Sequence, residues 1–154
     1  MKKYDKYIPL FVILYILALV GTVFYIVGIF TSFEREVTTG IIEGKEVTSI
    51  QINRLQSSTD QEIIVKDKKE IAKIMDSFSK VKLRETSSSH IRFKRSYWMT
   101  IHVGNERRLL LTLYDDKFLT IYNPEKSKDK SRFYKIRNRY DLKTIEDVFT
   151  NGSL

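Results

Sequence analysis

A run of 23 residues near the start, Ile8 to Phe30, constrains this chain more than any other feature. It contains no charged residue, and 16 of its members are Ile, Leu, Phe or Val. At about 1.5 Å per residue a helix of this length measures roughly 34 Å, enough to cross a hydrocarbon core about 30 Å thick. The sequence therefore predicts a transmembrane helix over residues 8–30, with the lipid bilayer as a partner.

The charges on either side of this run predict its orientation. Three lysines lie within residues 1–7, whereas Glu34, Arg35 and Glu36 follow the run. Basic residues beside a span stay in the cytoplasm, so residues 1–7 are expected to form a cytoplasmic tail of a single-pass protein in the cell membrane. A cleaved signal peptide is the alternative, but its apolar region is shorter and ends in a small-residue site, which residues 28–33 lack.

Small residues recur on one side of the predicted span. Ala18, Gly21, Thr22, Tyr25 and Gly28 fall near one stripe, which would let a second helix approach closely. The pattern contains no complete Gly-x-x-x-Gly motif, and scattered small residues explain it more simply. It leaves open an association with another membrane protein.

The rest of the chain is long enough for one compact domain and a connector. An apolar fraction of 42% with 30% charged residues is ordinary for a folded protein. The absence of cysteine excludes disulfides, zinc-thiolate sites and a cysteine nucleophile. We expect a stalk over residues 31–46 and an extracytoplasmic domain over 47–154.

The apolar periodicity of residues 47–154 predicts an α+β domain, in the order β-β-α-β-β-β-β-α. A helix with Ile71, Ile74, Met75 and Phe78 on one face begins after Asp67, and Arg84–His90 reads as a Ser-rich loop. We expect an antiparallel sheet of about five to six strands with two helices. The predicted strands are Val47–Leu55, Gln61–Val65, Tyr97–Val103, Leu109–Tyr114, Phe118–Tyr122 and Phe133–Ile136, and Asp141 caps a last helix with Leu142, Ile145, Val148 and Phe149 inward.

Alternation in the three central strands predicts both a core face and a candidate partner surface. Pairing Met99 with Leu113, and Leu113 with Leu119, aligns Ile101, Leu111 and Ile121 on one aliphatic face. The opposite face then carries an aromatic cluster beside a rung of threonines, which suits the binding of a protein, sugar or peptide. A covering helix or stalk is the structural alternative. This candidate surface comprises Trp98, Tyr114, Phe118, Thr100, Thr112 and Thr120.

Positive charge is concentrated in the second half of the domain. Residues 34–79 carry seven basic and nine acidic side chains, whereas residues 80–154 carry 17 and nine. A solvated surface accounts for such an excess, but it also suits an anionic partner such as a cell-surface polymer or lipid headgroups. The candidate anion-binding residues are Arg92, Lys94, Arg95, Arg137 and Arg139.

No catalytic constellation or cofactor motif stands out, so we expect a protein that is not an enzyme and uses no cofactor. His90 follows three serines in a loop, and His102 falls within a strand, where it packs. Asp115 and Asp116 fit a turn better than a metal pair.

Residues 46–149 resemble small domains of unknown function in Gram-positive bacteria, found on lipoproteins and single-pass membrane proteins of the Bacillus type. The features that carry the resemblance are the opening strand Thr48–Ile52, the helix start Asp67–Ile71 and the late strand Tyr134–Ile136. Lipoprotein members have a lipidated cysteine where this chain has its apolar run. The resemblance implies an extracytoplasmic setting and no catalytic residues.

These observations favour a membrane-anchored, extracytoplasmic binding module whose ligand is unknown. Two alternatives remain. One is a cytoplasm-facing domain that binds nucleic acid through the basic and aromatic residues 92–95 and 137–140. The charges around the apolar run disfavour nucleic acid as a partner, because this alternative requires the charge rule to fail. The other is a regulatory subunit of a larger membrane protein.

Overall fold

The computed structural model describes residues 8–56, 59–87, 91–125 and 130–151. The chain divides into two compact units, Met1–Phe30 and Thr31–Leu154, each described here by itself. The predicted cytoplasmic tail, residues 1–7, lies outside the described residues.

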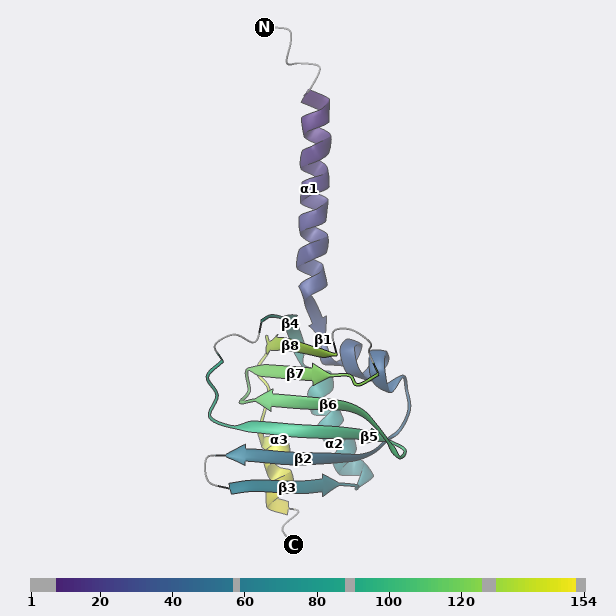
Figure 1. The fold of residues 1–154 in the computed structure, drawn as a ribbon, viewed down its shortest axis with the longest axis vertical. Coiled ribbons are helices and arrows are strands. Elements are labelled where there is room, and N and C mark those ends of the chain that lie inside the picture. Colours follow the sequence, from purple (N-terminus) through teal and green to yellow (C-terminus); the bar gives the residue numbers. More distant parts are fainter. Residues whose placement is uncertain (1–7, 57–58, 88–90, 126–129, 152–154) are drawn as a thin grey trace. The chain divides into compact units, whose positions relative to one another are not determined.

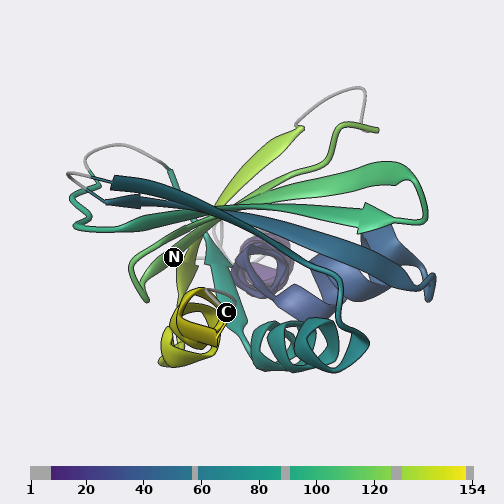
Figure 2. The same cartoon turned by 90° about the horizontal axis from the view of Figure 1, so that it is seen from below.

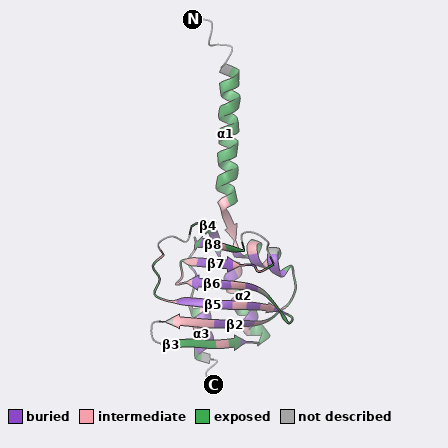
Figure 3. Cartoon of the chain, in the orientation of Figure 1, coloured by how far each residue is buried: buried purple, intermediate pink, exposed green. Residues whose placement is uncertain are grey.

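The first unit contains the helix α1, Ile8–Ile29. Residues 9–28 are exposed on every side of this helix, although nearly all of them are apolar (Figure 3). Apolar residues all around a helix require an apolar environment. By length and composition α1 could cross a membrane, as the sequence predicts.

The second unit is built on one sheet with the strand order β1-β4-β8-β7-β6-β5-β2-β3 (Figure 1). The strand pairs from β4 to β3 are all antiparallel. The strands are β1 Phe30–Ser32, β2 Val47–Gln56, β3 Thr59–Val65, β4 Lys82–Glu85, β5 Ser96–Val103, β6 Glu106–Tyr114, β7 Phe118–Tyr122 and β8 Ser131–Ile136.

Three helices of this unit lie on the same face of the sheet (Figure 2). They are the π-helix η2 Glu34–Ile42 and the α-helices α2 Lys68–Ser79 and α3 Lys143–Asn151. The core lies between them and the inward side chains of the strands. The predicted α+β class is therefore confirmed, with eight strands in the described part instead of the expected five to six.

Local sequence signals explain where α2 and α3 begin. The Asp67 carboxylate accepts hydrogen bonds from the backbone N–H groups of Lys69 and Glu70, at 3.0 Å each. The Asp141 carboxylate accepts one from Lys143 N at 3.0 Å. Such side-chain caps satisfy N–H groups that have no partner within the helix. Both predicted helices are confirmed, and their predicted inward faces pack against the core.

The predicted stalk over residues 31–46 is wrong. Phe33 and Val37 are fully buried, Ile41 and Ile42 are nearly so, and the Phe33 N–H donates to Val81 O at 3.0 Å. The i→i+5 hydrogen bonding of a π-helix places its buried positions four to five residues apart. A spacing of four residues also fits an amphipathic α-helix, but the apolar stripe is short and lies beside Gly40 and Gly44, so the sequence favours a connector over a helix.

The predicted Ser-rich loop Arg84–His90 overlaps strand β4 at its start, and this part of the prediction is wrong. β4 pairs with β8 but buries one side chain, Leu83, so its sequence shows no alternation. His90 lies outside the described residues.

The predicted faces of the central strands are correct, but one register is not. β6 and β7 pair as predicted, with Leu113 opposite Leu119. In β5 and β6, however, Met99 pairs with Leu111 rather than with Leu113. A shift of two residues leaves every side chain on the same face, so the apolar pattern cannot detect it.

The hairpin between β5 and β6 sets the true register. Its turn contains Gly104 with φ 60°, as required at the first central position of a type II′ turn. An uninterrupted two-residue hairpin would pair residue 101 with residue 108 and put the two aliphatic sets on opposite faces. A bulge between Ile101 and His102 adds one residue to β6, so that Ile101 pairs with Leu109.

Candidate functional site

One face of the sheet has no helix of the described part over it (Figure 2). We call it the open face; it carries Trp98, Thr112 and Thr120 of the central strands and their neighbours on the same side. Trp98 is 53% exposed, and Phe93, in the loop before β5, is 49% exposed. Large apolar side chains on a rigid, uncovered surface are features of interaction sites.

The observed register rearranges the predicted partner surface. Trp98, Thr112, Thr120 and Phe133 lie in one rung across four strands. Thr100 belongs to the next rung, opposite Leu110, so the predicted rung of three threonines is wrong. The predicted residues do share the open face, because the two-residue error preserves side-chain direction.

The predicted single cluster of Trp98, Tyr114 and Phe118 is wrong, because Tyr114 lies opposite Ser96 and not opposite Trp98. The aromatic rings in contact on the open face are those of Tyr114 and Phe118 with Phe93 and Phe133. The Tyr114 ring lies 4.8 Å from Phe93 and 6.1 Å from Phe133, and Phe118 stacks on Phe133 at 5.6 Å. Trp98 makes no ring contact with another described aromatic residue, but it lines a depression of about 530 Å³ together with Phe93 and Tyr114. The alternation of β8 could have placed Phe133, whereas Phe93 lies in a loop without a period.

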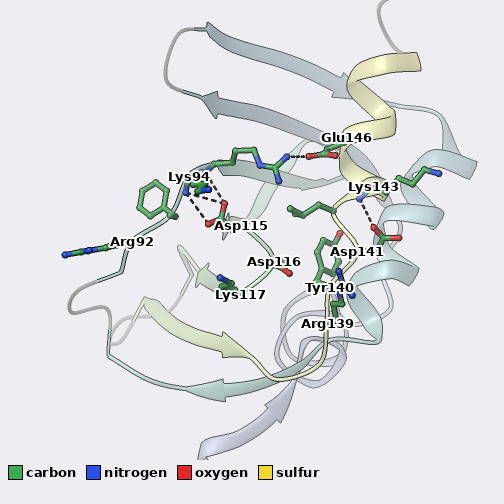
Figure 4. A pocket seen from close by; sticks show the side chains of 13 residues that line it. Arg92, Lys94, Asp115, Asp116, Lys117, Arg139, Tyr140, Asp141, Lys143 and Glu146 are labelled. Carbon is green, nitrogen blue, oxygen red and sulfur yellow. Dashed lines mark hydrogen bonds and ion pairs between the residues drawn. The ribbon is translucent and has the colours of Figure 1, made fainter.

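The second candidate site is a cavity of about 910 Å³ (Figure 4). Three chain segments line it: residues 92–95 before β5, the β6–β7 turn 115–117, and residues 139–143 with Glu146 at the start of α3. We call it the basic cavity. Of the predicted anion-binding residues, Arg92, Lys94, Arg95 and Arg139 line it, whereas Arg137 does not, and Lys117 and Lys143 are additions.

Asp115 connects two of these segments. Its carboxylate accepts hydrogen bonds from Lys94 N at 3.2 Å and Arg95 N at 3.1 Å, and its own N–H donates to Arg95 O at 3.0 Å (Figure 4). Asp115 has φ 50°, a left-handed conformation that aspartate tolerates better than most residues. The predicted turn role of Asp115 is confirmed, and the turn holds the 92–95 segment in place.

Glu146 of α3 also has partners within the domain. Its carboxylate pairs with the Arg95 guanidinium and accepts a hydrogen bond from the Tyr97 hydroxyl at 3.1 Å. Burial, together with the negative charge of Glu146, raises the pKa of Tyr97. These contacts fix Arg95 against α3, so this arginine is a structural part of the cavity wall.

The basic side chains that line the cavity outnumber the acidic ones, and fewer of them have a partner. Six basic and four acidic residues line it. Asp115, Asp141 and Glu146 accept hydrogen bonds inside the domain. Within the described part of the chain, five basic side chains form no ion pair or hydrogen bond: Arg92, Lys94, Lys117, Arg139 and Lys143. The cavity therefore presents an excess of unpaired positive charge, which attracts anions.

Other candidate chemistry is sparse. Among the described residues no group of three His, Asp or Glu side chains lies close enough to hold a metal ion. His102 lies in β5 opposite Arg107 and is half-buried, as expected for a packing residue.

The fold and these surfaces define a small α+β domain that follows one apolar helix long enough to span a membrane. Residues 36–135, more than half of the chain, match the model of the family DUF5301, whose description reads "Domain of unknown function (DUF5300)". The chain therefore belongs to the DUF5301 family. Searches of curated proteins and of solved structures found no match. The family match runs from η2 into β8 and excludes α1 and the α3 side of the basic cavity.

Proposed function

We propose that this chain is a membrane-anchored binding module. In this proposal α1 holds the protein in the cell membrane, and the α+β domain lies on the extracytoplasmic side. The open face contacts a partner, and the domain catalyses no reaction.

The observation that carries the proposal is the difference between the two faces of the sheet. Three helices cover one face, whereas the other leaves Trp98 53% exposed beside further aromatic residues (Figure 2). Burying an indole on a partner removes a large apolar area from water, and tryptophan is enriched among residues that dominate binding energy. The antiparallel sheet holds these side chains in a fixed arrangement.

The proposed orientation rests on the charges around α1. Lysines lie before the helix and Glu34 and Glu36 after it, the distribution typical of a cytoplasmic N-terminus. The resemblance to extracytoplasmic domains of Gram-positive bacteria points the same way.

Cysteine labelling can test both parts of the proposal, because the natural chain contains no cysteine. Single-cysteine variants Lys3→Cys, Lys69→Cys and Thr120→Cys would be treated with a membrane-impermeant maleimide on intact cells. We expect Lys69→Cys to react before lysis and Lys3→Cys only after it. Labelling of Lys69→Cys only after lysis would overturn the orientation and favour the nucleic-acid alternative.

The same variants test the open face. Relative to Lys69→Cys, on exposed α2, Thr120→Cys should react more slowly on cells than in the purified full chain. Thr120 lies in the rung of Trp98, so a partner seated on the open face protects position 120 and leaves position 69 accessible, while Trp98 itself stays in place. An unchanged ratio of the two labelling rates would overturn the proposed surface.

A further inference from the structure

The basic cavity and the depression on the open face are neighbours that share part of their walls. Phe93 and Lys94 line both of them. The Phe93 ring contacts Tyr114 at 4.8 Å on the open face, while the backbone of Lys94 is held by Asp115 in the cavity wall. A ligand longer than one cavity could therefore follow a continuous path from Trp98 to Arg139.

Charge is distributed unevenly along this path. Asp60 lines the depression, and Glu62 lies in the rung of Trp98, two strands away across Asn53. At the other end the basic cavity carries its five unpaired cations. A polymer with a negative charge on every unit is repelled at the Trp98 end, whereas a ligand with a neutral part and an anionic part matches both ends.

We propose that this path binds an acidic oligosaccharide, with a neutral sugar unit against Trp98 and a carboxylate or phosphate substituent in the basic cavity. The inference rests on the proposed function, because it names the ligand class of the open face. The basic cavity adds the charge recognition that the open face lacks.

The side chains around Trp98 suit a sugar. A flat, exposed indole can stack against the apolar face of a sugar ring, as aromatic side chains do with other flat ligand surfaces. Asn53 and Thr112 flank Trp98 in the same rung and offer an amide and a hydroxyl to the ring's hydroxyl groups. Nucleic acid fits less well because its phosphates would approach Glu62.

The concave form of the basic cavity distinguishes this ligand from a membrane surface. Its cations come from three segments around a volume of about 910 Å³ (Figure 4). A substituent that projects into the cavity can reach several of these cations at once, and guanidinium and ammonium groups bind carboxylate and phosphate through charge-assisted hydrogen bonds. A flat layer of headgroups reaches only the rim.

The test uses the purified full chain in neutral detergent, whose single tryptophan is Trp98. Its fluorescence therefore reports from the open face alone. The probes are two matched pairs, and each acidic member has neutral sugar units and one anionic group. One pair is a xylo-oligosaccharide carrying a single glucuronate substituent and its neutral methyl ester, and the other is a manno-oligosaccharide carrying a single phosphate and its dephosphorylated form. We expect at least one acidic member to change Trp98 emission and to bind about tenfold or more tightly than its neutral partner. The pair that responds identifies the anionic group.

Two double variants separate the cavity from general charge effects. Lys117→Gln with Lys143→Gln removes two exposed cavity lysines, whereas Lys45→Gln with Lys69→Gln removes two exposed lysines elsewhere. The first should weaken the acidic probe about tenfold and the second less than about twofold, since only the first removes contacts with the anion. Equal effects of the two variants would overturn the role of the cavity.

Three further outcomes would overturn the ligand class. They are equal affinity for inorganic polyphosphate, tighter binding of a single-stranded oligonucleotide, and a Trp98 response to phosphatidylglycerol vesicles but to neither acidic sugar. Failure of both acidic probes also rejects the inference. The proposed function survives that result if Thr120→Cys is still protected on cells, and it fails independently if that protection is missing.

Discussion

The ring of Phe33 stacks on the ring of Phe78, with centroids 5.0 Å apart and an angle of 25° between the planes. Through this contact the segment that follows the apolar helix closes the core against α2. Phe78 stacks in turn on Tyr140, at 4.8 Å, so three distant parts of the chain meet in one aromatic column.

Phe33→Ala should therefore lower the free energy of unfolding by about 3–5 kcal/mol, the usual cost of a large-to-small change in a core. Arg35→Ala, two residues further along and exposed, should change it by no more than about 0.5 kcal/mol. Denaturation of the full chain followed by circular dichroism measures both. If both variants lose less than about 0.5 kcal/mol, residues 31–46 are a stalk and not part of the core.

Trp98 and Tyr97 are adjacent in β5 and point to opposite faces of the sheet. Tyr97 is fully buried and Trp98 is 53% exposed. Tyr97→Ala should cost about 3–5 kcal/mol of stability, whereas Trp98→Ala should stay within about 1 kcal/mol. A large loss of stability in Trp98→Ala, measured by the same denaturation, would contradict an open face.

Substitutions at Asp115 should separate its carboxylate from its backbone conformation. Asp115→Asn keeps an acceptor for Lys94 N and Arg95 N and tolerates the left-handed φ, so it should be the mildest change. Asp115→Gly loses the acceptor, and Asp115→Ala also adds about 1–2 kcal/mol of backbone strain. Thermal denaturation should rank stability as Asn above Gly above Ala. Equal stability of Gly and Ala would exclude strain at this turn.

Stability should fall in strongly alkaline solution. Burial raises the pKa of Tyr140, and burial together with the negative charge of Glu36 raises the pKa of Tyr134. Because the folded pKa values exceed the unfolded value near about 10, folding favours the protonated phenols. Their contribution is complete below about pH 10 and is lost as the pH rises toward the folded pKa values.

Tyr140→Phe removes one of these ionisable groups and retains a ring that can stack on Phe78. It should lose about 1 kcal/mol at neutral pH, because the 3.1 Å contact with the Ser77 hydroxyl is gone. Above about pH 10 its stability should decline less steeply than that of the natural chain. Denaturation midpoints across this range provide the comparison, and identical slopes would contradict the linkage.

The parts of the fold that could be predicted are those with a complete local signal. α2 has a capping aspartate, Asp67, and apolar residues at helical spacing. Both signals lie within the helix or directly before it, so they can be recognised without knowledge of the tertiary structure. The faces of β5 to β7 follow from strict alternation. By contrast, η2 has only Val37, Ile41 and Ile42 as apolar residues in its nine positions and β4 buries only Leu83, so both periods are too short to recognise.

The candidate site could be predicted only as separate pieces. The sequence predicts Arg92 and Arg139 as basic candidates, but their convergence depends on the turn at Asp115 and on where α3 begins. β5 and β8 are separated by two strands, so strand adjacency does not bring these residues together. The contribution of Lys117 and Lys143 follows from tertiary structure alone.

The bulge between Ile101 and His102 restricts how the length of the β5–β6 hairpin can vary. Deleting one residue from the turn, or inserting one, would turn Trp98 inward and Met99 outward relative to β6. Adding or removing two residues returns the apolar side chains of β5 and β6 to the same face of the sheet. Removing the bulge together with one turn residue has the same result. Functional relatives should therefore show hairpin length changes in even steps, or odd steps accompanied by loss of the bulge.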